Sequence, residues 1–185
     1  MQTKDVNLKW EVLESEYLHK RPWLTVRQER LLMPNGTVVP EYYVLEYPNW
    51  VNIIAINKKK EFVMIKQYRP GIQMTCYELC AGVCDEDDAS PLASAKRELL
   101  EETGYGGGKW TEFMRVAPNA SATTNWSYCF IAEDVEKISE QSLDESEQII
   151  VKLFTFDQLK KLLDDGEILQ ATMAAPLWKY MAKKG

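Results

Sequence analysis

Residues 82–105 read Gly-Val-Cys-Asp-Glu-Asp-Asp-Ala-Ser-Pro-Leu-Ala-Ser-Ala-Lys-Arg-Glu-Leu-Leu-Glu-Glu-Thr-Gly-Tyr. Ser90 can cap the free amides at the start of a helix, and Pro91 suits the first helical position. Gly104 suits the other end, because glycine readily adopts the left-handed conformation that closes a helix. These signals predict a helix over residues 91–103, preceded by an acidic turn.

The spacing of side chains divides this helix into an apolar side and a charged side. Leu92, Ala95 and Leu99 recur at intervals of three and four residues, so we expect them to face the core. The charged residues then lie on other faces of the helix: Arg97, Glu98, Glu101 and Glu102.

The three glutamates are grouped. Glu98 lies three residues before Glu101 and four before Glu102, so all three carboxylates can project toward one side, where like charges repel by roughly a few tenths of a kcal/mol per pair. Carboxylate oxygens are the hard ligands that Mg²⁺ prefers, so a cation would relieve this repulsion. A solvated helix face, paired with Lys96 and Arg97, is the alternative interpretation.

The amino-acid composition limits the kinds of catalytic site that the chain can contain. The chain has 185 residues, of which 45% are apolar and 27% charged, as in one soluble globular domain with a short accessory element. His19 is the single histidine, which argues against multi-histidine metal sites and Ser-His-Asp catalysis. The 28 aspartates and glutamates are therefore the groups on which we expect the chemistry to rest.

Charge and apolar patterning also bear on partners and location. A net charge of −6 argues against a nucleic-acid partner, because phosphate backbones are bound through basic surfaces. No apolar run is long enough to span a membrane, and the N-terminus lacks a secretory signal. We expect a cytoplasmic protein without a membrane partner, in which the four cysteines are reduced thiols.

Strand and helix signals alternate through the rest of the chain. The turn Pro34-Asn35-Gly36 predicts a hairpin between residues 26–33 and 37–47. Other predicted strands cover residues 50–56, 61–69, 75–82, 110–116, 126–132 and 149–154, and two further helices lie around residues 156–165 and 169–183, with Gly166 between them and a kink expected at Pro176.

The central stretch resembles the Nudix box, G-x5-E-x7-R-E-U-x-E-E-x-G-U, in which U is a bulky apolar residue. Residues 97–105 match its second half at every fixed position. In the first half, the slot of the box glutamate falls on Ala89 and that of the glycine on Val83. Gly82 fits only with one extra residue in the loop, and Asp88 is the acid placed to pair with Arg97 in its stead.

This resemblance implies a fold. The expected class is α+β, a Nudix-type α/β/α sandwich with a mixed sheet, plus an N-terminal antiparallel β accessory region. The accessory region would cover residues 1–48 and the hydrolase domain residues 49–185. From about Trp23 to the C-terminal helices, the sequence looks more loosely like the ADP-ribose pyrophosphatase, or nucleotide-sugar, branch of the family.

The resemblance also implies roles for individual residues. Arg97 would orient the glutamates, and the metal ligands would be the Ala81 carbonyl, Glu98, Glu101 and Glu102. Arg69 and Glu78 would bind the substrate or organise the site, and the loop Ala117–Ser121 would help to recognise the sugar. In the acidic loop before residue 149, Glu145 would be the catalytic base, with Glu147 as the second candidate.

The implied reaction is hydrolysis of the pyrophosphate bond of ADP-ribose or a related nucleotide sugar, with Mg²⁺ as cofactor and Mn²⁺ as the alternative ion. Its products would be a nucleoside monophosphate and a sugar phosphate. Two other functions stay open: a nucleoside triphosphate pyrophosphatase, and a Nudix-fold sensor that binds a nucleotide without turnover. The N-terminal strands resemble the element through which members of this branch form homodimers.

Overall fold

The computed structural model describes residues 7–184. They divide into two units, each with its own set of contacts. The smaller unit holds the residues up to Tyr47 together with Asn119–Asn125, and the larger unit holds Pro48–Pro118 and the residues from Trp126 onward. Within the described range, no helix combines the length and apolar character needed to cross a bilayer.

The smaller unit is a three-stranded antiparallel sheet in the order β1-β2-β3. The hairpin predicted at Pro34-Asn35-Gly36 is confirmed: Gly36 has a φ of 85° and its amide donates to the Met33 carbonyl at 2.9 Å. The loop Asn119–Asn125, which also belongs to this unit, runs beside the third strand, where the Leu45 amide donates to the Ala122 carbonyl at 2.8 Å. The strands are β1 (Glu11–Arg21), β2 (Leu24–Leu32) and β3 (Val38–Glu46).

The larger unit is built on a mixed sheet in the order β10-β5-β6-β4-β9-β7, with β8 paired to β9. The pair β4 and β9 is parallel, and the other pairs are antiparallel. The strands are β4 (Trp50–Asn57), β5 (Phe62–Arg69), β6 (Met74–Val83), β7 (Tyr105–Gly106), β8 (Lys109–Val116), β9 (Ser127–Lys137) and β10 (Ile150–Phe154). Each of these strands overlaps a predicted strand except β7, which is too short to leave a periodic pattern, and β9 continues to Lys137, beyond the predicted end at residue 132.

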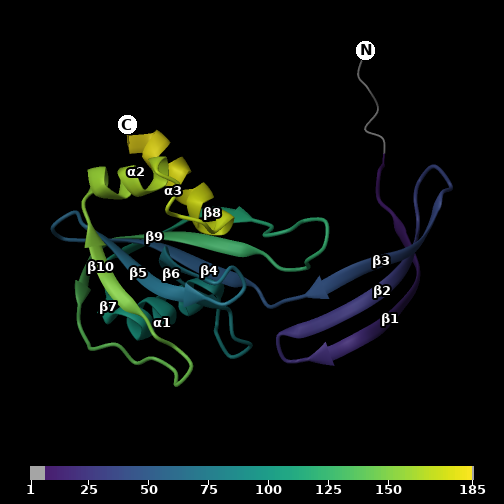
Figure 1. The fold of residues 1–185 in the computed structure, drawn as a ribbon, viewed down its shortest axis with the longest axis horizontal. Coiled ribbons are helices and arrows are strands. Elements are labelled where there is room, and N and C mark those ends of the chain that lie inside the picture. Colours follow the sequence, from purple (N-terminus) through teal and green to yellow (C-terminus); the bar gives the residue numbers. More distant parts are fainter. Residues whose placement is uncertain (1–6, 185) are drawn as a thin grey trace, which may run out of the picture. The chain divides into compact units, whose positions relative to one another are not determined.

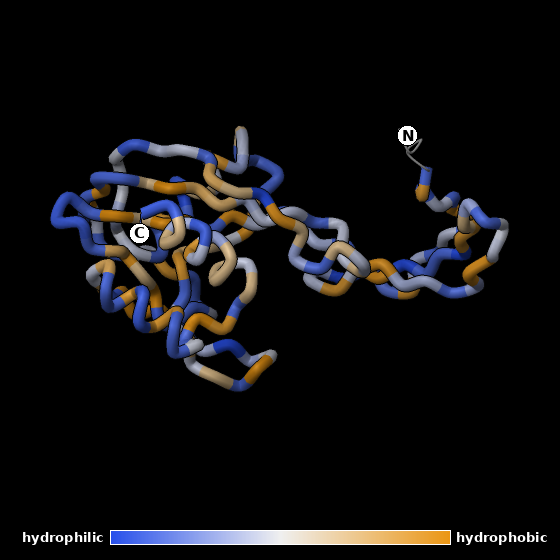
Figure 2. Tube along the Cα trace, turned by 90° about the horizontal axis from the view of Figure 1, so that it is seen from above, coloured by the Kyte–Doolittle hydropathy of each residue, from blue (hydrophilic) through white to orange (hydrophobic). Residues whose placement is uncertain are grey.

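Helices cover both faces of this sheet, as the α/β/α sandwich requires: α1 lies on one face and α2 and α3 on the other (Figure 1). They span α1 (Pro91–Thr103), α2 (Phe156–Asp164) and α3 (Ala171–Lys184), and α3 continues through Pro176. In the larger unit, apolar stretches run mainly through the interior and hydrophilic stretches lie mainly along the outside (Figure 2).

Side chains of β4 point alternately to the two faces of the sheet and pack in the two core clusters of the larger unit. Val51, Ile53 and Ala55 pack in the cluster under α1, whereas Ile54 and Ile56 pack in the cluster under α2 and α3. A strand buried on both faces is apolar at consecutive positions, which explains the apolar run at residues 53–56. Cys76, Cys80 and Cys129 are buried, Cys84 is half-buried, and all four are free thiols as expected.

The predicted helix 91–103 is confirmed at both ends. The Ser90 hydroxyl oxygen accepts a hydrogen bond from the Ala93 amide, and Gly104 closes the helix at a φ of 73°. Ala95 and Leu99 are fully buried, as their spacing predicted. Glu102 differs from the expectation for the charged face: it is 4% exposed, because the helix lies against β6 at this point.

Candidate active site

Arg97 is the centre of the ionic contacts on α1. Its Nη1 donates to Glu98 Oε1 at 2.9 Å and to Glu101 Oε2 at 3.0 Å. Its Nη2 donates to the Val83 carbonyl at 3.0 Å, which ties the helix to the end of β6. One guanidinium group therefore fixes two of the three predicted metal ligands and the strand beside them.

Asp88 pairs with Arg97 even though its side chain is shorter than that of glutamate. Arg97 Nη2 lies 2.9 Å from Asp88 Oδ2 and 3.0 Å from Asp85 Oδ2. The hydrogen bond from Arg97 holds the pKa of Asp88 below its usual range. Five residues separate Gly82 from Asp88, as in the first half of the box. The extra residue thus lies after Asp88, before the helix begins.

Gly82 fills the role of the box glycine because of a close approach. A Cβ atom at this position would lie 2.0 Å from the Glu98 carboxyl carbon and 2.2 Å from its Oε1. Real Cβ contacts essentially never come below 3.0 Å. Only glycine lets the Glu98 carboxylate lie directly on the strand, so the spacing Gly82-x5-Asp88 is the sequence signal that identifies both residues.

Glu102 is the most buried of the three glutamates. Its Oε2 accepts a hydrogen bond from the Ala81 amide at 3.1 Å. Burial raises the pKa of Glu102 to about 8, and the charges of Glu98 and Glu147 act in the same direction, while the Ala81 amide opposes them. Burial likewise raises the pKa of Glu98, against the opposing effect of Arg97. Negative charge at this point is therefore poorly stabilised by the protein alone.

These residues fit a hard divalent cation. Within residues 7–184, no group of three or more histidine, cysteine, aspartate or glutamate side chains forms a ready-made metal cage, and Arg97 binds one oxygen each of Glu98 and Glu101. The other oxygens of Glu98 and Glu101, and the buried carboxyl of Glu102, offer hard donors beside β6. A cation there would stabilise the charges that burial disfavours.

The acidic loop before β10 brings a further carboxylate to this cluster. The resemblance to the Nudix family implied Glu145 as the base and Glu147 as the second candidate. Glu147 is the loop residue whose charge adds to the raised pKa values of both Glu98 and Glu102, after the larger effect of burial. Nothing local in the sequence distinguishes the two, because the choice depends on how the loop folds back onto α1.

Arg69 and Glu78 form a partly buried pair on β5 and β6. Arg69 Nη2 lies 2.6 Å from Glu78 Oε2, and Gln67 Nε2 donates to the same oxygen at 2.9 Å. Glu78 is 2% exposed, so its contacts favour the organising role rather than contact with a substrate. Burial would lower the pKa of Arg69, but Glu78, with a smaller contribution from Glu102, raises it above the usual value.

A hollow of about 280 Å³ opens beside this pair. Arg69 and Glu78 line it together with Ile72, Leu169 and Gln170, the last two from the connection between α2 and α3. Its walls are largely apolar and include one cation, Arg69. The charge of Glu102 contributes to the raised pKa of this side chain. Such a lining suits a ligand with a flat or apolar part and an anionic part.

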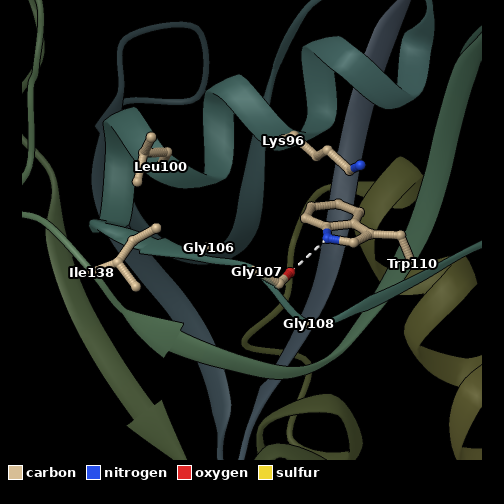
Figure 3. A pocket seen from close by; sticks show the side chains of 7 residues that line it. All are labelled: Lys96, Leu100, Gly106, Gly107, Gly108, Trp110 and Ile138. Atoms are coloured by element: carbon tan, nitrogen blue, oxygen red, sulfur yellow. Dashed lines mark hydrogen bonds between the residues drawn. The ribbon is translucent and has the colours of Figure 1, made fainter.

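A second hollow, of about 260 Å³, lies against a different side of α1 (Figure 3). Lys96 and Leu100 contribute to it from the helix, and Trp110 Nε1 donates to the Gly107 carbonyl at 2.8 Å across its floor. Lys96 is two residues from Glu98 and therefore points roughly 200° away around the helix axis. The hollow contains no carboxylate, so the acidic site lies on the other side of α1.

The loop Ala117–Ser121 is divided between the two units. Ser121 lies in the smaller unit, where its carbonyl accepts a hydrogen bond from the Tyr42 hydroxyl. Contact of this loop with a sugar stays a prediction.

Comparison with known proteins agrees with this geometry. The model of the NUDIX domain matches residues 47–175, and the model of the nucleoside diphosphate sugar hydrolase N-terminal domain matches residues 10–45. The chain belongs to the Nudix family. This Nudix chain is a hydrolase that acts on nucleoside diphosphate-linked substrates, and pyrophosphatases of the family generally need divalent metal ions.

Individual relatives cover most of this Nudix chain. An ADP-ribose pyrophosphatase of Bacillus subtilis (strain 168) is 29% identical over 79% of this chain and 78% of its own length. A GDP-mannose pyrophosphatase of Escherichia coli O1:K1 is 30% identical over 68% of this chain and 69% of its own length. A crystal structure of an ADP compounds hydrolase, 22% identical, superposes with a TM-score of 0.84 over 99% of both chains, which establishes the shared fold.

Proposed function

We propose that this protein hydrolyses the pyrophosphate bond of ADP-ribose or a closely related nucleotide sugar in a Mg²⁺-dependent reaction, with Mn²⁺ as the alternative ion. On ADP-ribose, the products are AMP and ribose 5-phosphate. The observation that carries the proposal is the pair Glu98 and Glu101 on Arg97, with the buried Glu102 on the same helix. The charge of Glu102 acts on Arg69, which lines the apolar hollow. The N-terminal match to the nucleoside diphosphate sugar hydrolases favours nucleotide sugars over nucleoside triphosphates.

In this proposal the residues of α1 bind the metal. Glu98, Glu101 and Glu102 hold the ion together with the Ala81 carbonyl, and Arg97 keeps two of the carboxylates in place. When bound, a divalent cation neutralises the diphosphate and lowers the pKa of water. The raised pKa of Glu102 means that binding an ion displaces a proton from this carboxyl over part of the neutral range.

The remaining roles concern the substrate and the proton. Arg69, held by Glu78, binds the negatively charged diphosphate from the side of the apolar hollow. A carboxylate of the acidic loop accepts the proton of the attacking water. Glu145 and Glu147 are the two candidates, and the effect of Glu147 on the pKa values of Glu98 and Glu102 favours Glu147.

The test is release of AMP from ADP-ribose beside a panel of nucleotide sugars and nucleoside triphosphates, with Mg²⁺, with Mn²⁺ or with EDTA. We expect cleavage of a nucleotide sugar that requires the metal and is lost in Glu102→Gln. Preferred turnover of a triphosphate would move the protein to another Nudix activity. Binding of a nucleotide without turnover by the native chain would instead support a sensor.

We also propose that the protein is a cytoplasmic homodimer formed through the N-terminal sheet. In the described part of this sheet, only Glu29 and Leu31 are buried, so three strands carry almost no core of their own. Large apolar side chains remain exposed there, among them Tyr17 at 51%, Trp23 at 69% and Val12 at 52%. A second copy of the chain would cover such surfaces.

Analytical ultracentrifugation tests this state directly. The native chain should sediment as a dimer, and Trp23→Ser should shift it toward the monomer. A native chain that stays monomeric at high micromolar concentration would exclude the homodimer.

A further inference from the structure

The segment that follows β9 is attached to the end of α1. The amides of Ile138 and Ser139 donate to the Gly104 carbonyl at 2.8 and 3.1 Å, and the Ser142 amide donates to the Glu101 carbonyl at 2.9 Å. Carbonyls in the last turn of a helix have no partner within the helix. This segment supplies those partners, so its course is set by the helix that bears the glutamates.

Two glycines allow this close attachment. A Cβ atom at Gly104 would lie 2.2 Å from the Ser139 carbonyl oxygen, and one at Gly106 would lie 2.7 Å from Ile138 Cδ1. Figure 3 shows Ile138 and Leu100 pointing toward each other beside Gly106. The start of the segment is therefore packed as well as hydrogen-bonded.

Gln141 joins this attachment to the far end of the acidic loop. Its Nε2 donates to the Glu102 carbonyl at 2.6 Å and to the Ile149 carbonyl at 3.3 Å. Glu102 is 4% exposed and Ile149 6%, so both residues lie where water is scarce. One side-chain amide thus closes residues 142–148 into a loop and ties that loop to the helix turn that carries Glu102.

The acidic residues in the closed loop are ordered by a local pair of hydrogen bonds. The Asp144 amide donates to Glu147 Oε2 at 3.1 Å, and the Glu147 amide donates to the Asp144 carbonyl at 2.9 Å. The loop that contains Glu147 is held on the helix turn of Glu101 and Glu102, by the Ser142 amide on the Glu101 carbonyl and by Gln141 on the Glu102 carbonyl. Because Glu147 lies two residues before the closure at Ile149, its position relative to α1 depends on that closure.

We propose that Gln141 is a positioning residue for hydrolysis, which holds Glu147 against the metal-binding face of α1. This inference rests on the proposed function, in which a carboxylate of the acidic loop accepts a proton from water. It adds a residue outside the box and outside the acidic loop. Gln141 acts through the loop and touches neither metal nor substrate.

Gln141→Met tests the inference, because methionine keeps the length of the side chain but removes both donors. We expect the loop to open and kcat to fall on the order of 10- to 100-fold, as a displacement of about 1 Å in a catalytic group produces. KM should change little, because Arg69 and the hollow are untouched. Gln158→Met is the matched control: it removes a glutamine contact to the Thr155 amide at the start of α2 and should leave kcat unchanged.

A double-mutant cycle separates positioning from simple destabilisation. Kinetics of Gln141→Met, Glu147→Gln and the double variant are measured on the best nucleotide-sugar substrate, with hydrogen exchange of residues 142–148 alongside. In the Glu147→Gln background, loss of Gln141 should add almost nothing to the loss of kcat. Faster exchange in Gln141→Met should be confined to the loop.

Three results would overturn the inference: unchanged kcat in Gln141→Met, additive losses in the double variant, or full activity in Glu147→Gln. Failure of the proposed function is distinguishable, because the native chain would then turn over no nucleotide sugar at all. Even so, the exchange measurement would decide whether Gln141 closes the loop, since unchanged exchange in Gln141→Met would refute the closure without reference to catalysis.

Discussion

Replacing Gly82 by alanine should lower activity strongly while leaving the fold intact. The new Cβ would lie 2.0 Å from the Glu98 carboxyl carbon, and an ordinary contact begins at 3.4 Å. The carboxyl carbon must therefore move by 1.4 Å, the difference between these two distances. A shift of this size in a metal ligand should lower kcat about 100-fold, which corresponds to about 2.7 kcal/mol of activation free energy.

The expected effect on stability is much smaller. The atoms that must move are the end of a flexible side chain, and Gly82 does not have the positive φ that disfavours alanine. We expect the free energy of unfolding to fall by no more than about 1 kcal/mol. Half-maximal activity should require more Mg²⁺, because one ligand is displaced from the site.

Gly166→Ala is the control with the opposite pattern. Gly166 has a φ of 75° and open space around its Cβ position, so alanine strains the backbone by about 1–2 kcal/mol without displacing a neighbour. This variant should lose stability and keep kcat. The assay is steady-state AMP release with a Mg²⁺ titration, together with urea unfolding of each variant. Wild-type kcat in Gly82→Ala would refute the argument that Glu98 must lie directly on the strand.

Other predictions concern pH, the ionic contacts and the helix cap. The folded pKa of Glu102, about 8, lies above its unfolded value of 4.5, so the metal-free protein should lose stability, on the order of a few kcal/mol, as pH rises between these values. Unfolding of the native chain and Glu102→Gln across pH 4.5 to 8 checks this, and equal slopes would contradict it. Arg97→Lys should lower kcat/KM roughly 10- to 100-fold and Asp88→Asn about tenfold, measured as Mg²⁺-dependent turnover, because Arg97 orients two metal ligands and Asp88 holds Arg97. If both variants were as active as the native chain, these residues would have no role in orienting the metal ligands. Ser90→Ala should lower the free energy of unfolding by about 1 kcal/mol through loss of the helix cap, with kcat unchanged; an unaltered urea midpoint would show that the cap contributes nothing.

Agreement between sequence and structure is best where the signals are local. The ends of α1 were predicted from Ser90 and Gly104, and both residues cap the helix as expected. The hairpin at residues 34–36 follows from turn chemistry in the same way. Such features depend on atoms a few residues apart, so any fold that forms these segments reproduces them.

Agreement is weaker where distant segments meet. Spacing along the helix placed Glu102 on a charged face, yet β6 buries it and supplies the Ala81 amide as its partner. The shifted first half of the box offered Asp88 as the partner of Arg97, whereas the folded turn brings Asp85 to the same guanidinium group as well. Each of these outcomes depends on the path of the chain before the helix.

The sequence by itself determined the helix, the grouping of its carboxylates and hence the chemistry that suits them, because caps and residue spacing act within a few turns. Only the tertiary structure decided that Glu98 rests on Gly82, that Glu102 has a pKa of about 8, and that Gln141 closes the acidic loop. The physical reason is the distance along the chain between the residues that interact. Burial and close approach arise when strands and loops remote in the chain are packed against α1, and that packing is fixed by the core of the whole unit.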